Sequence, residues 1–282
     1  MKGLTDQSYW EEAWWQRKRP ERLHLYRDFD FETVHLLARA GARGCRALEL
    51  GGGGSRILPY LGRKFGFRVF GSDFSRRGCR LLKANLALQG MQGGVVCEDL
   101  FQPSLAPESF DLVFSSGLIE HFDDTAAAIV QHVRLIKPGG KVVLIVPNFE
   151  GVQGRIFAKL APPLWQIHRI FGPNELAEAI SGLGLQDICR GYLGSFYIHI
   201  GYDSQWTAFS AWPRWLWFLT YVAVRVGNGL ISLAFRLSPW KPHTRWFSPA
   251  FFAVGTKPSG GKCSAPSTQQ PGRKAVVAVK SS

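Results

Sequence analysis

Cysteine is scarce and scattered in this sequence, which has five cysteines in 282 residues and no closely spaced pair. Zinc sites and dithiol redox centres need two thiols a few residues apart, and disulfide frameworks belong mostly to short secreted chains. The sequence therefore predicts no metal site and reduced thiols in a cytosolic protein. The first twelve residues, MKGLTDQSYWEE, are polar and acidic, unlike a secretory signal peptide.

Acidic residues are missing from the last part of the chain, since none follows Asp203. Ten lysines and arginines lie beyond that point, which leaves only +3 of the formal net charge of +13 for residues 1–203. A one-sided basic segment favours contact with an anionic surface, either lipid headgroups or nucleic acid. Residues 259–282 are rich in Gly, Ser, Pro, Gln and Lys, so they are predicted to be a disordered basic tail.

Short apolar segments alternate with helical patterns over residues 44–258. The predicted strands are CRALEL, RVFGS, GVVCE, FDLVFSS, KVVLIVP, one at about 185–193 and a last one within 248–258. The predicted helices between them cover about 54–65, 75–89, 124–136 and a segment that begins at Pro173. This alternation predicts an α/β fold, a Rossmann-like, doubly wound, seven-stranded and mostly parallel sheet with helices on both faces. Helices at 5–18 and 31–40 are assigned to an N-terminal helical cap, residues 1–43.

Four consecutive glycines, at positions 51–54, follow the first predicted strand and precede a helix. Glycines in this place let a ligand approach the backbone, although a tight turn without a ligand is the alternative. The dinucleotide fingerprint G-x-G-x-x-G fails, because its last glycine is Arg56 or Ile57 in the two registers. We therefore expect no dinucleotide. Gly51 and Gly53 are expected to matter for close approach, and Gly52 and Gly54 to be only permissive.

Acidic side chains stand at the ends of successive predicted strands. Glu49 ends the first strand, Asp73 the second, and Asp99 the third. A carboxylate in the position of Asp73 can accept both ribose hydroxyls of an adenosine, and Asp99 can accept from the adenine amino group. No lysine lies in the glycine loop to neutralise a phosphate. The pattern favours a nucleoside ligand that carries ammonium, hydroxyl and amino donors.

Six motifs, in this order, resemble those of the class I S-adenosylmethionine-dependent methyltransferases, of the bacterial small-molecule branch of the methyltransferase 11/12 type. They are LELGGGGS, GSDFS, CEDLF, SSGLIEHF, LIKPGGKVVLIVPN and HRIFGPNELAEAISGLGL, and they cover about residues 45–195. The segment FSPAFFAVGTKP fits the closing strand of that family. The resemblance implies S-adenosyl-L-methionine as the cofactor, bound by a domain that covers residues 44–258.

The same resemblance implies a role for each residue of these motifs. The methionine part of the cofactor is expected to be lined by Glu49, Gly51 and Gly53. The adenosine part is expected to be held by Asp73, Phe74, Asp99 and Leu100. The pocket below the sulfonium is expected to be closed by Ser116, Gly117 and His121. The segment SYWEEAWW resembles a cap, so Tyr9 or Trp10 is expected to cover the cofactor or, alternatively, to be a core aromatic.

Two histidines, His121 and His168, are candidates for a general base, with a structural role as the alternative for each. Methyl transfer from a sulfonium depends mainly on alignment and needs a base only where the acceptor holds its proton. The fourth strand is followed by neither N-P-P-[YFW] nor Pro-Cys, which disfavours methylation of adenine amino groups or of cytosine C5 in nucleic acid. A small or lipid-like acceptor is expected.

An apolar, aromatic-rich and basic insertion, residues 194–247, precedes the last strand. Its segment 215–235 is nearly long enough to span a bilayer, but Arg225 at its centre would cost about 2.5–3.5 kcal/mol. On one helix, Arg214, Arg225 and Arg236 share a stripe, because eleven residues complete nearly whole turns. Three interpretations stay open: a helical pair that covers the active site as a lid, a helix in the membrane plane, and a transmembrane span.

The sequence thus predicts a methyltransferase that acts on a small-molecule or lipid-like acceptor. The expected location is the cytoplasm, with peripheral attachment to an anionic inner membrane face left open. The alternatives are an RNA methyltransferase that uses the basic C-terminal region and a membrane-associated S-adenosylmethionine-binding protein without turnover. The acceptor and the oligomeric state are not determined by the sequence.

Overall fold

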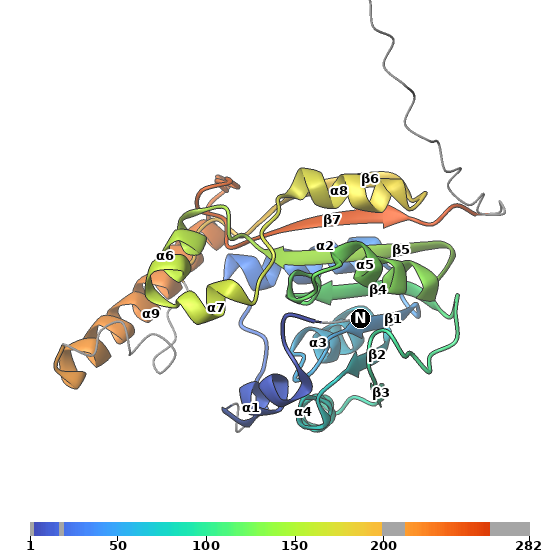
Figure 1. Cartoon of the computed structure of the whole chain (residues 1–282), viewed down its shortest axis with the longest axis horizontal. Coiled ribbons are helices and arrows are strands. Elements are labelled where there is room, and N and C mark those ends of the chain that lie inside the picture. The colour runs from blue at the N-terminus through green and yellow to red at the C-terminus, as the bar shows by residue number, and fades with distance from the viewer. Residues whose placement is uncertain (1–2, 17–19, 199–211, 260–282) are drawn as a thin grey trace, which may run out of the picture.

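A seven-stranded sheet forms the centre of the computed structural model, which describes residues 3–16, 20–198 and 212–259 (Figure 1). The strand order is β3-β2-β1-β4-β5-β7-β6. The strands are β1 (Arg46–Leu50), β2 (Arg68–Asp73), β3 (Gly94–Cys97), β4 (Phe110–Ser116), β5 (Ile136–Pro147), β6 (Gln186–Leu193) and β7 (Ala250–Thr256). Strands β1 to β5 pair in parallel, whereas β7 runs antiparallel to both β5 and β6. The predicted fold class is confirmed.

Helices cover both faces of the sheet. One face carries α5 (Thr125–Leu135) and α8 (Pro173–Gly182), and the other carries α2 (Asp28–Ala40), α3 (Ile57–Phe65) and α4 (Arg76–Leu88). The side chains of β5 alternate between the two cores, since Leu144 packs with α5 and α8 while Val143 packs with α2 and α3. The central strands β1, β4 and β5 are mostly buried on both sides, so their sequences are largely apolar, whereas the edge strand β6 is mostly exposed or half-buried.

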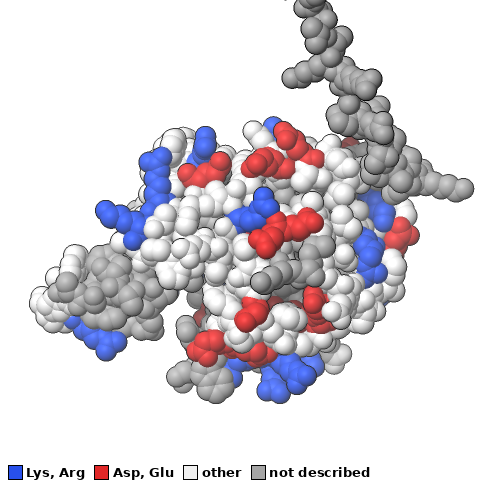
Figure 2. All heavy atoms as spheres, viewed as in Figure 1, with Lys and Arg blue, Asp and Glu red and all other residues white. Residues whose placement is uncertain are grey.

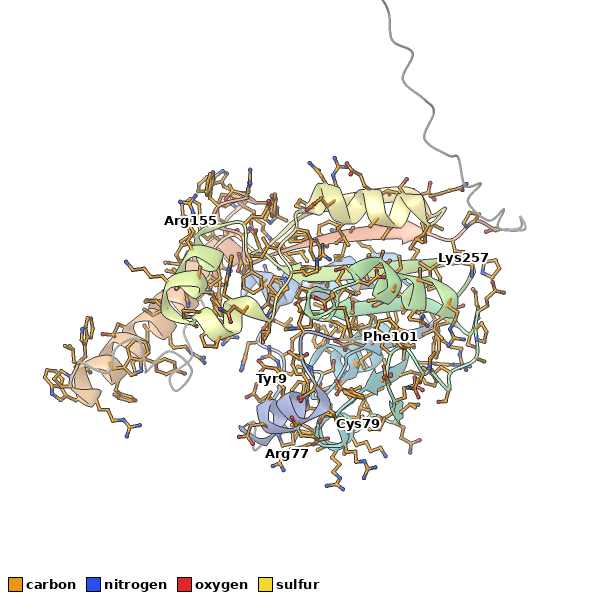
Figure 3. All side chains as sticks on the ribbon, in the orientation of Figure 1. Tyr9, Arg77, Cys79, Phe101, Arg155 and Lys257 are labelled. Atoms are coloured by element: carbon orange, nitrogen blue, oxygen red, sulfur yellow. The ribbon has the colours of Figure 1, made fainter. Side chains whose placement is uncertain are left out.

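The order of the strands reverses at β1. The chain passes from β1 outward to β2 and β3 and then returns to β4, on the other side of β1. Ligands of doubly wound sheets bind outside the carboxyl ends of the strands at such a point. The helix α1 (Gln7–Gln16) contacts α4 close to these ends, and Figure 3 shows Tyr9 of α1 beside α4, on which Arg77 and Cys79 lie.

Two helices, α6 (Val152–Leu160) and α7 (Pro162–Gln166), were not predicted. The insertion contains α9 (Arg214–Leu237), a single helix of 24 residues, so the interpretation of its segment 215–235 as a helical pair is wrong. The other predicted helices and all strands are present with shifts of a few residues at their ends. The predicted disordered tail lies outside the described residues, apart from residue 259.

The helix α9 is attached to the domain through polar groups. Ser232 donates a hydrogen bond of 2.6 Å to Asp28 at the start of α2, and Asp28 also accepts from the backbone of Ser195. Asn228 exchanges two hydrogen bonds with the backbone of Ile198. Near the end of α9, the guanidinium of Arg236 lies 3.5 Å from the ring centroid of Phe31. The side of α9 that carries Asn228, Ser232 and Arg236 therefore faces the protein, whereas Arg214 and Arg225 are exposed.

The opposite side of α9 is apolar and exposed. Large apolar residues recur every three or four positions on it: Trp215, Leu219, Val222, Val226, Leu230, Leu233 and Leu237. Leu230 is 64% exposed and Leu237 is 74% exposed. Figure 1 shows α9 projecting obliquely from the sheet, and its sequence contains no acidic residue. In Figure 2 the visible side chains of the projecting part are basic or uncharged. This distribution is the reverse of the usual one for a helix at a water-facing surface, where apolar residues face the core.

Candidate functional site

A cavity of about 580 Å³ lies at the carboxyl ends of β1, β2 and β4. The structure places all ten residues that the sequence assigns to the cofactor around it: Glu49, Gly51, Gly53, Asp73, Phe74, Asp99, Leu100, Ser116, Gly117 and His121. They come from four separate segments, and the sheet topology brings these together because parallel strands end on one edge.

The glycine loop connects β1 to α3 and carries the floor of the cavity. Gly51 has φ +68° and Gly54 has φ +61°, a left-handed conformation that side chains other than glycine rarely adopt. A Cβ on Gly53 would lie 2.5 Å from a carboxylate oxygen of Asp73 and 2.9 Å from the Trp14 ring. The prediction that Gly54 is only permissive is wrong, since the turn itself needs its positive φ.

Asp73 joins β2 to the glycine loop. Its two carboxylate oxygens accept backbone hydrogen bonds from Gly53, at 2.7 Å, and from Ser75, at 2.8 Å. Burial raises the pKa of Asp73 to about 6 against these two hydrogen bonds, which lower it. The carboxylate is consequently held rigidly at the cavity wall, with lone pairs left for donors of a ligand.

Glu49 is a second buried carboxyl group in the wall. The hydroxyl of Ser55 donates to it, and Ser55 also caps the start of α3. Burial raises the pKa of Glu49 to about 8, and the neighbouring charge of Asp73 adds to this rise. The cavity therefore contains a carboxyl group that favours protonation unless a cation lies beside it.

The opposite end of the cavity suits a flat aromatic ligand. Phe74 is exposed at the end of β2, and its backbone carbonyl accepts a hydrogen bond of 3.0 Å from the side chain of Gln7. Asp99 uses one carboxylate oxygen to accept from the backbone of Phe101 at 2.9 Å, and a carboxylate has further lone pairs that can accept from a ligand. Phe74, Asp99 and Leu100 thus combine an aromatic ring, an acceptor and an apolar side chain.

The helix α1 covers the cavity with tryptophans. Trp10 lines it and meets the ring of His121 edge to face at a centroid distance of 5.0 Å. Tyr9 does not line the cavity but packs against Trp10 at 5.1 Å. Trp14 also lines it, over the glycine loop, and was not predicted as a site residue although it lies in the predicted amphipathic helix.

His121 and His168 lie together beside the cavity, with ring centroids 4.4 Å apart. His121 lines the cavity and donates through Nδ1 to the carbonyl of Ile167 at 3.0 Å, which leaves Nε2 as an acceptor. Burial and the neighbouring His168 lower the pKa of His121 to about 3, so this imidazole is neutral. His168 does not line the cavity itself and packs on Phe149 at 4.6 Å.

Glu120 completes a cluster with these two histidines and was not predicted as a site residue. It is fully buried, burial raises its pKa to about 8, and neither carboxylate oxygen has a hydrogen-bond partner among the described residues. Ligand atoms of Glu120, His121 and His168 lie within 4.8 Å of one another, an arrangement that can hold a metal ion. The sequence predicted no metal site, because His168 lies 47 positions beyond His121 and meets Glu120 and His121 only in the fold.

Comparison with known proteins links this cavity to one chemistry. Residues 48–144 match the model of a family described as a methyltransferase domain. The ubiquinone biosynthesis O-methyltransferase of Xanthomonas axonopodis pv. citri is 29% identical over 187 residues, which cover 61% of this chain and 75% of that protein. The corresponding protein of Xylella fastidiosa is 27% identical over 194 residues, or 62% of this chain and 75% of the relative.

Solved structures have the same fold. A methyltransferase from Thermotoga maritima that depends on S-adenosylmethionine aligns with a TM-score of 0.54 at 17% identity and covers 89% of this chain and 95% of its own. Phosphoethanolamine N-methyltransferase 2 of Haemonchus contortus, solved with S-adenosyl-L-methionine, gives a TM-score of 0.54 at 20% identity, over 81% of this chain and 52% of that chain.

Proposed function

We propose that this chain, which belongs to the class I S-adenosylmethionine-dependent methyltransferases, methylates a hydroxyl oxygen of a small, largely apolar acceptor at a membrane surface. The oxygen acceptor is suggested by the names of the O-methyltransferases to which the chain is similar. The membrane surface is suggested by the exposed apolar side of α9, and this observation carries the proposal.

The cavity fits the cofactor chemically. Six carboxyl groups line it, against a single arginine: Asp6, Asp30, Glu49, Asp73, Glu98 and Asp99. Such a wall suits a ligand with a sulfonium, an ammonium, two ribose hydroxyls and an adenine amino group. Gly53 leaves no room for a side chain, because a Cβ there would meet Asp73 and Trp14, and this lets its backbone N–H reach the Asp73 carboxylate.

The bound cofactor supplies an activated methyl group on a positively charged sulfur. The chain's contribution is mainly alignment of the acceptor with that methyl group, which can supply roughly 7–11 kcal/mol. Glu49 and Asp73 hold the two ends of the donor, and α1 excludes water from above through Trp10 and Trp14. A hydroxyl acceptor must also lose its proton, and Nε2 of His121 offers an acceptor at the cavity wall, with His168 and Glu120 behind it.

The proposed acceptor is apolar because apolar side chains form part of the cavity wall. They include Leu23, Phe29, Ile57 and Leu118. Phe29 also follows Asp28, the residue that binds α9, so the wall of the cavity and the attachment point of α9 are neighbours in the chain. An acceptor dissolved in a bilayer would therefore have its source close to the protein's exposed apolar helix.

The helix α9 is long and apolar enough to cross a membrane, with a mean hydropathy of 1.5 over its most apolar 18 residues, of which only 11% are buried. We favour an in-plane position over a span. The side of α9 that carries Asn228 and Ser232 is turned toward the domain, so a helix lying flat would immerse its opposite, apolar side. The excess of basic over acidic residues after Asp203 supports an anionic, inner membrane face.

The direct test is to incubate the purified chain with labelled S-adenosyl-L-methionine and fractions of lipid, water-soluble small molecules and RNA. We expect label in the lipid fraction, as a methyl ether that survives mild alkali, whereas a methyl ester would not. The Asp73→Ala variant is the control for background transfer. Label mainly in RNA, or no transfer to any fraction by a chain that binds the cofactor, would contradict the proposal.

Cofactor binding should also release protons at neutral pH. Burial holds the pKa of Glu49 at about 8 in the free protein, so its carboxyl group is mostly protonated. An adjacent ammonium stabilises the carboxylate and lowers this pKa, so binding expels a fraction of a proton, and affinity rises with pH up to about 8. Calorimetry with S-adenosylhomocysteine in two buffers of different ionisation enthalpy measures the number of protons released per cofactor bound. Glu49→Gln should abolish the release, and equal heats for the unaltered chain in both buffers would refute the assignment.

A further inference from the structure

Arg56 is the only arginine or lysine that lines the cavity among the described residues, and it stands at the start of α3. Its guanidinium lies between two carboxylates, 3.8 Å from Glu21 and 4.0 Å from Asp30. Both distances exceed the 2.7–3.2 Å of a hydrogen bond from nitrogen to oxygen. The guanidinium is thus placed by charge but retains its donors for another partner.

Asp30, on α2, presents the opposite charge to the same cavity. Its side chain is only 6% exposed, and one carboxylate oxygen has no hydrogen-bond partner among the described residues. A buried charged oxygen without a partner is costly, so its persistence in the wall indicates that a donor belongs there. The nearby cations Arg56 and Arg27 favour the carboxylate form against the effect of burial, which raises the pKa of Asp30.

The pair therefore offers one cation and one anion, both with unused hydrogen-bonding capacity, within 4.0 Å of each other. A ligand group that satisfies both must carry a carboxylate and an ammonium on neighbouring atoms, as an α-amino acid does. Arg56 comes directly after the glycine loop at the end of β1, whereas Asp73 and Asp99 follow β2 and β3. Arg56 and the residues expected to hold the adenosine therefore come from different strand ends.

We propose that Arg56 binds the α-carboxylate of the methionine end of the cofactor, and that Asp30 shares the α-ammonium with Glu49. This assignment rests on the binding of S-adenosyl-L-methionine and adds two residues to those inferred from the motifs. It also gives a function to the arginine that breaks the dinucleotide fingerprint. Where a dinucleotide-binding loop needs a small residue, this chain has a side chain that recognises a zwitterion.

The test compares two ligands that differ in this end. S-adenosylhomocysteine carries the amino acid group, and 5′-methylthioadenosine lacks it but retains the nucleoside and the sulfur. We expect Arg56→Ala to raise the calorimetric Kd for S-adenosylhomocysteine at least tenfold and to leave that for 5′-methylthioadenosine within twofold. Asp30→Asn should also raise the Kd for S-adenosylhomocysteine and not that for 5′-methylthioadenosine. Arg63→Ala is the matched control, because Arg63 is exposed on the same helix and does not line the cavity.

Each other outcome overturns the assignment. An unchanged affinity for S-adenosylhomocysteine removes Arg56 from the site, and an equal loss for both ligands shows that Arg56 only supports the loop. If Arg56→Ala does not fold, Arg56→Lys answers the same question, because it keeps the charge but not the planar guanidinium. Arg56→Lys should still lower the affinity for S-adenosylhomocysteine and leave that for 5′-methylthioadenosine unchanged. Failure of the unaltered chain to bind S-adenosylhomocysteine would instead refute the cofactor itself, which separates the two hypotheses.

Discussion

The Asp73→Ala variant should bind S-adenosylhomocysteine about a hundredfold more weakly than the unaltered chain does. The carboxylate is expected to accept two ribose hydroxyls, and hydrogen bonds to charged groups contribute about 1.5–3 kcal/mol each. Asp73 also holds the backbone of Gly53 and Ser75, so its removal frees the glycine loop. Isothermal calorimetry measures the loss directly, and thermal unfolding measures whether the fold persists.

The choice of ligand separates this effect from that of Arg56. Both S-adenosylhomocysteine and 5′-methylthioadenosine carry the ribose, so Asp73→Ala should weaken both to a similar extent. Asp73→Asn keeps one acceptor oxygen, so its affinity for both ligands should lie between that of the unaltered chain and that of Asp73→Ala. If Asp73→Ala retains the affinity of the unaltered chain while its fold is intact, Asp73 does not bind the ribose.

The second large effect is expected at the membrane. We expect Val226→Glu combined with Leu230→Glu to lower the affinity of the chain about a hundredfold for vesicles that mix phosphatidylcholine with phosphatidylglycerol. Both side chains lie on the exposed apolar side of α9 and do not line the cavity. Each substitution removes an apolar side chain from the lipid and adds a charge, which is costly in a bilayer and repels anionic headgroups. Vesicle flotation or sedimentation measures the partition.

A matched pair of substitutions controls for the change in net charge. Leu88→Glu combined with Val130→Glu also replaces two exposed apolar residues, but on α4 and α5, and should leave vesicle binding unchanged. Cofactor affinity should remain in both variants. Equal vesicle binding by the α9 variant and the unaltered chain would exclude α9 as the membrane contact, and an equal loss in both variants would show that only net charge matters.

The sequence predicts the centre of the sheet well because strands β1, β4 and β5 are mostly buried on both faces. An apolar segment such as KVVLIVP has few alternatives between two glycine-containing turns, and β5 contains it in full. The ten predicted cofactor residues meet around one cavity for a related reason, because strand ends of a parallel sheet converge whatever the intervening loops do. The short helices α6 and α7 escape prediction, since five to nine residues carry too little periodic pattern and Pro162 separates them.

Contacts between distant segments are the part that sequence reasoning missed. No pattern near Glu120 indicates that His168, 48 positions away, lies beside it. Likewise, Asp28 contacts Ser232, 204 positions away. Arg56 and Asp30 likewise come from separate helices, so only the tertiary structure reveals that both face the cavity. Single-sequence patterns report the local environment of a residue, and each of these features depends on packing between elements.

The position of β7 constrains the order in which this chain can fold. Although β7 comes last of the strands, it lies between β5 and β6, and β6 has no other neighbour in the sheet. During synthesis, β5 consequently keeps an open edge until Ala250–Thr256 has left the ribosome, after the whole of α9. An apolar helix is thus exposed before the sheet closes, a state prone to aggregation in water. If α9 binds a bilayer, as proposed, early contact would shield that helix, and membrane binding would then precede completion of the fold.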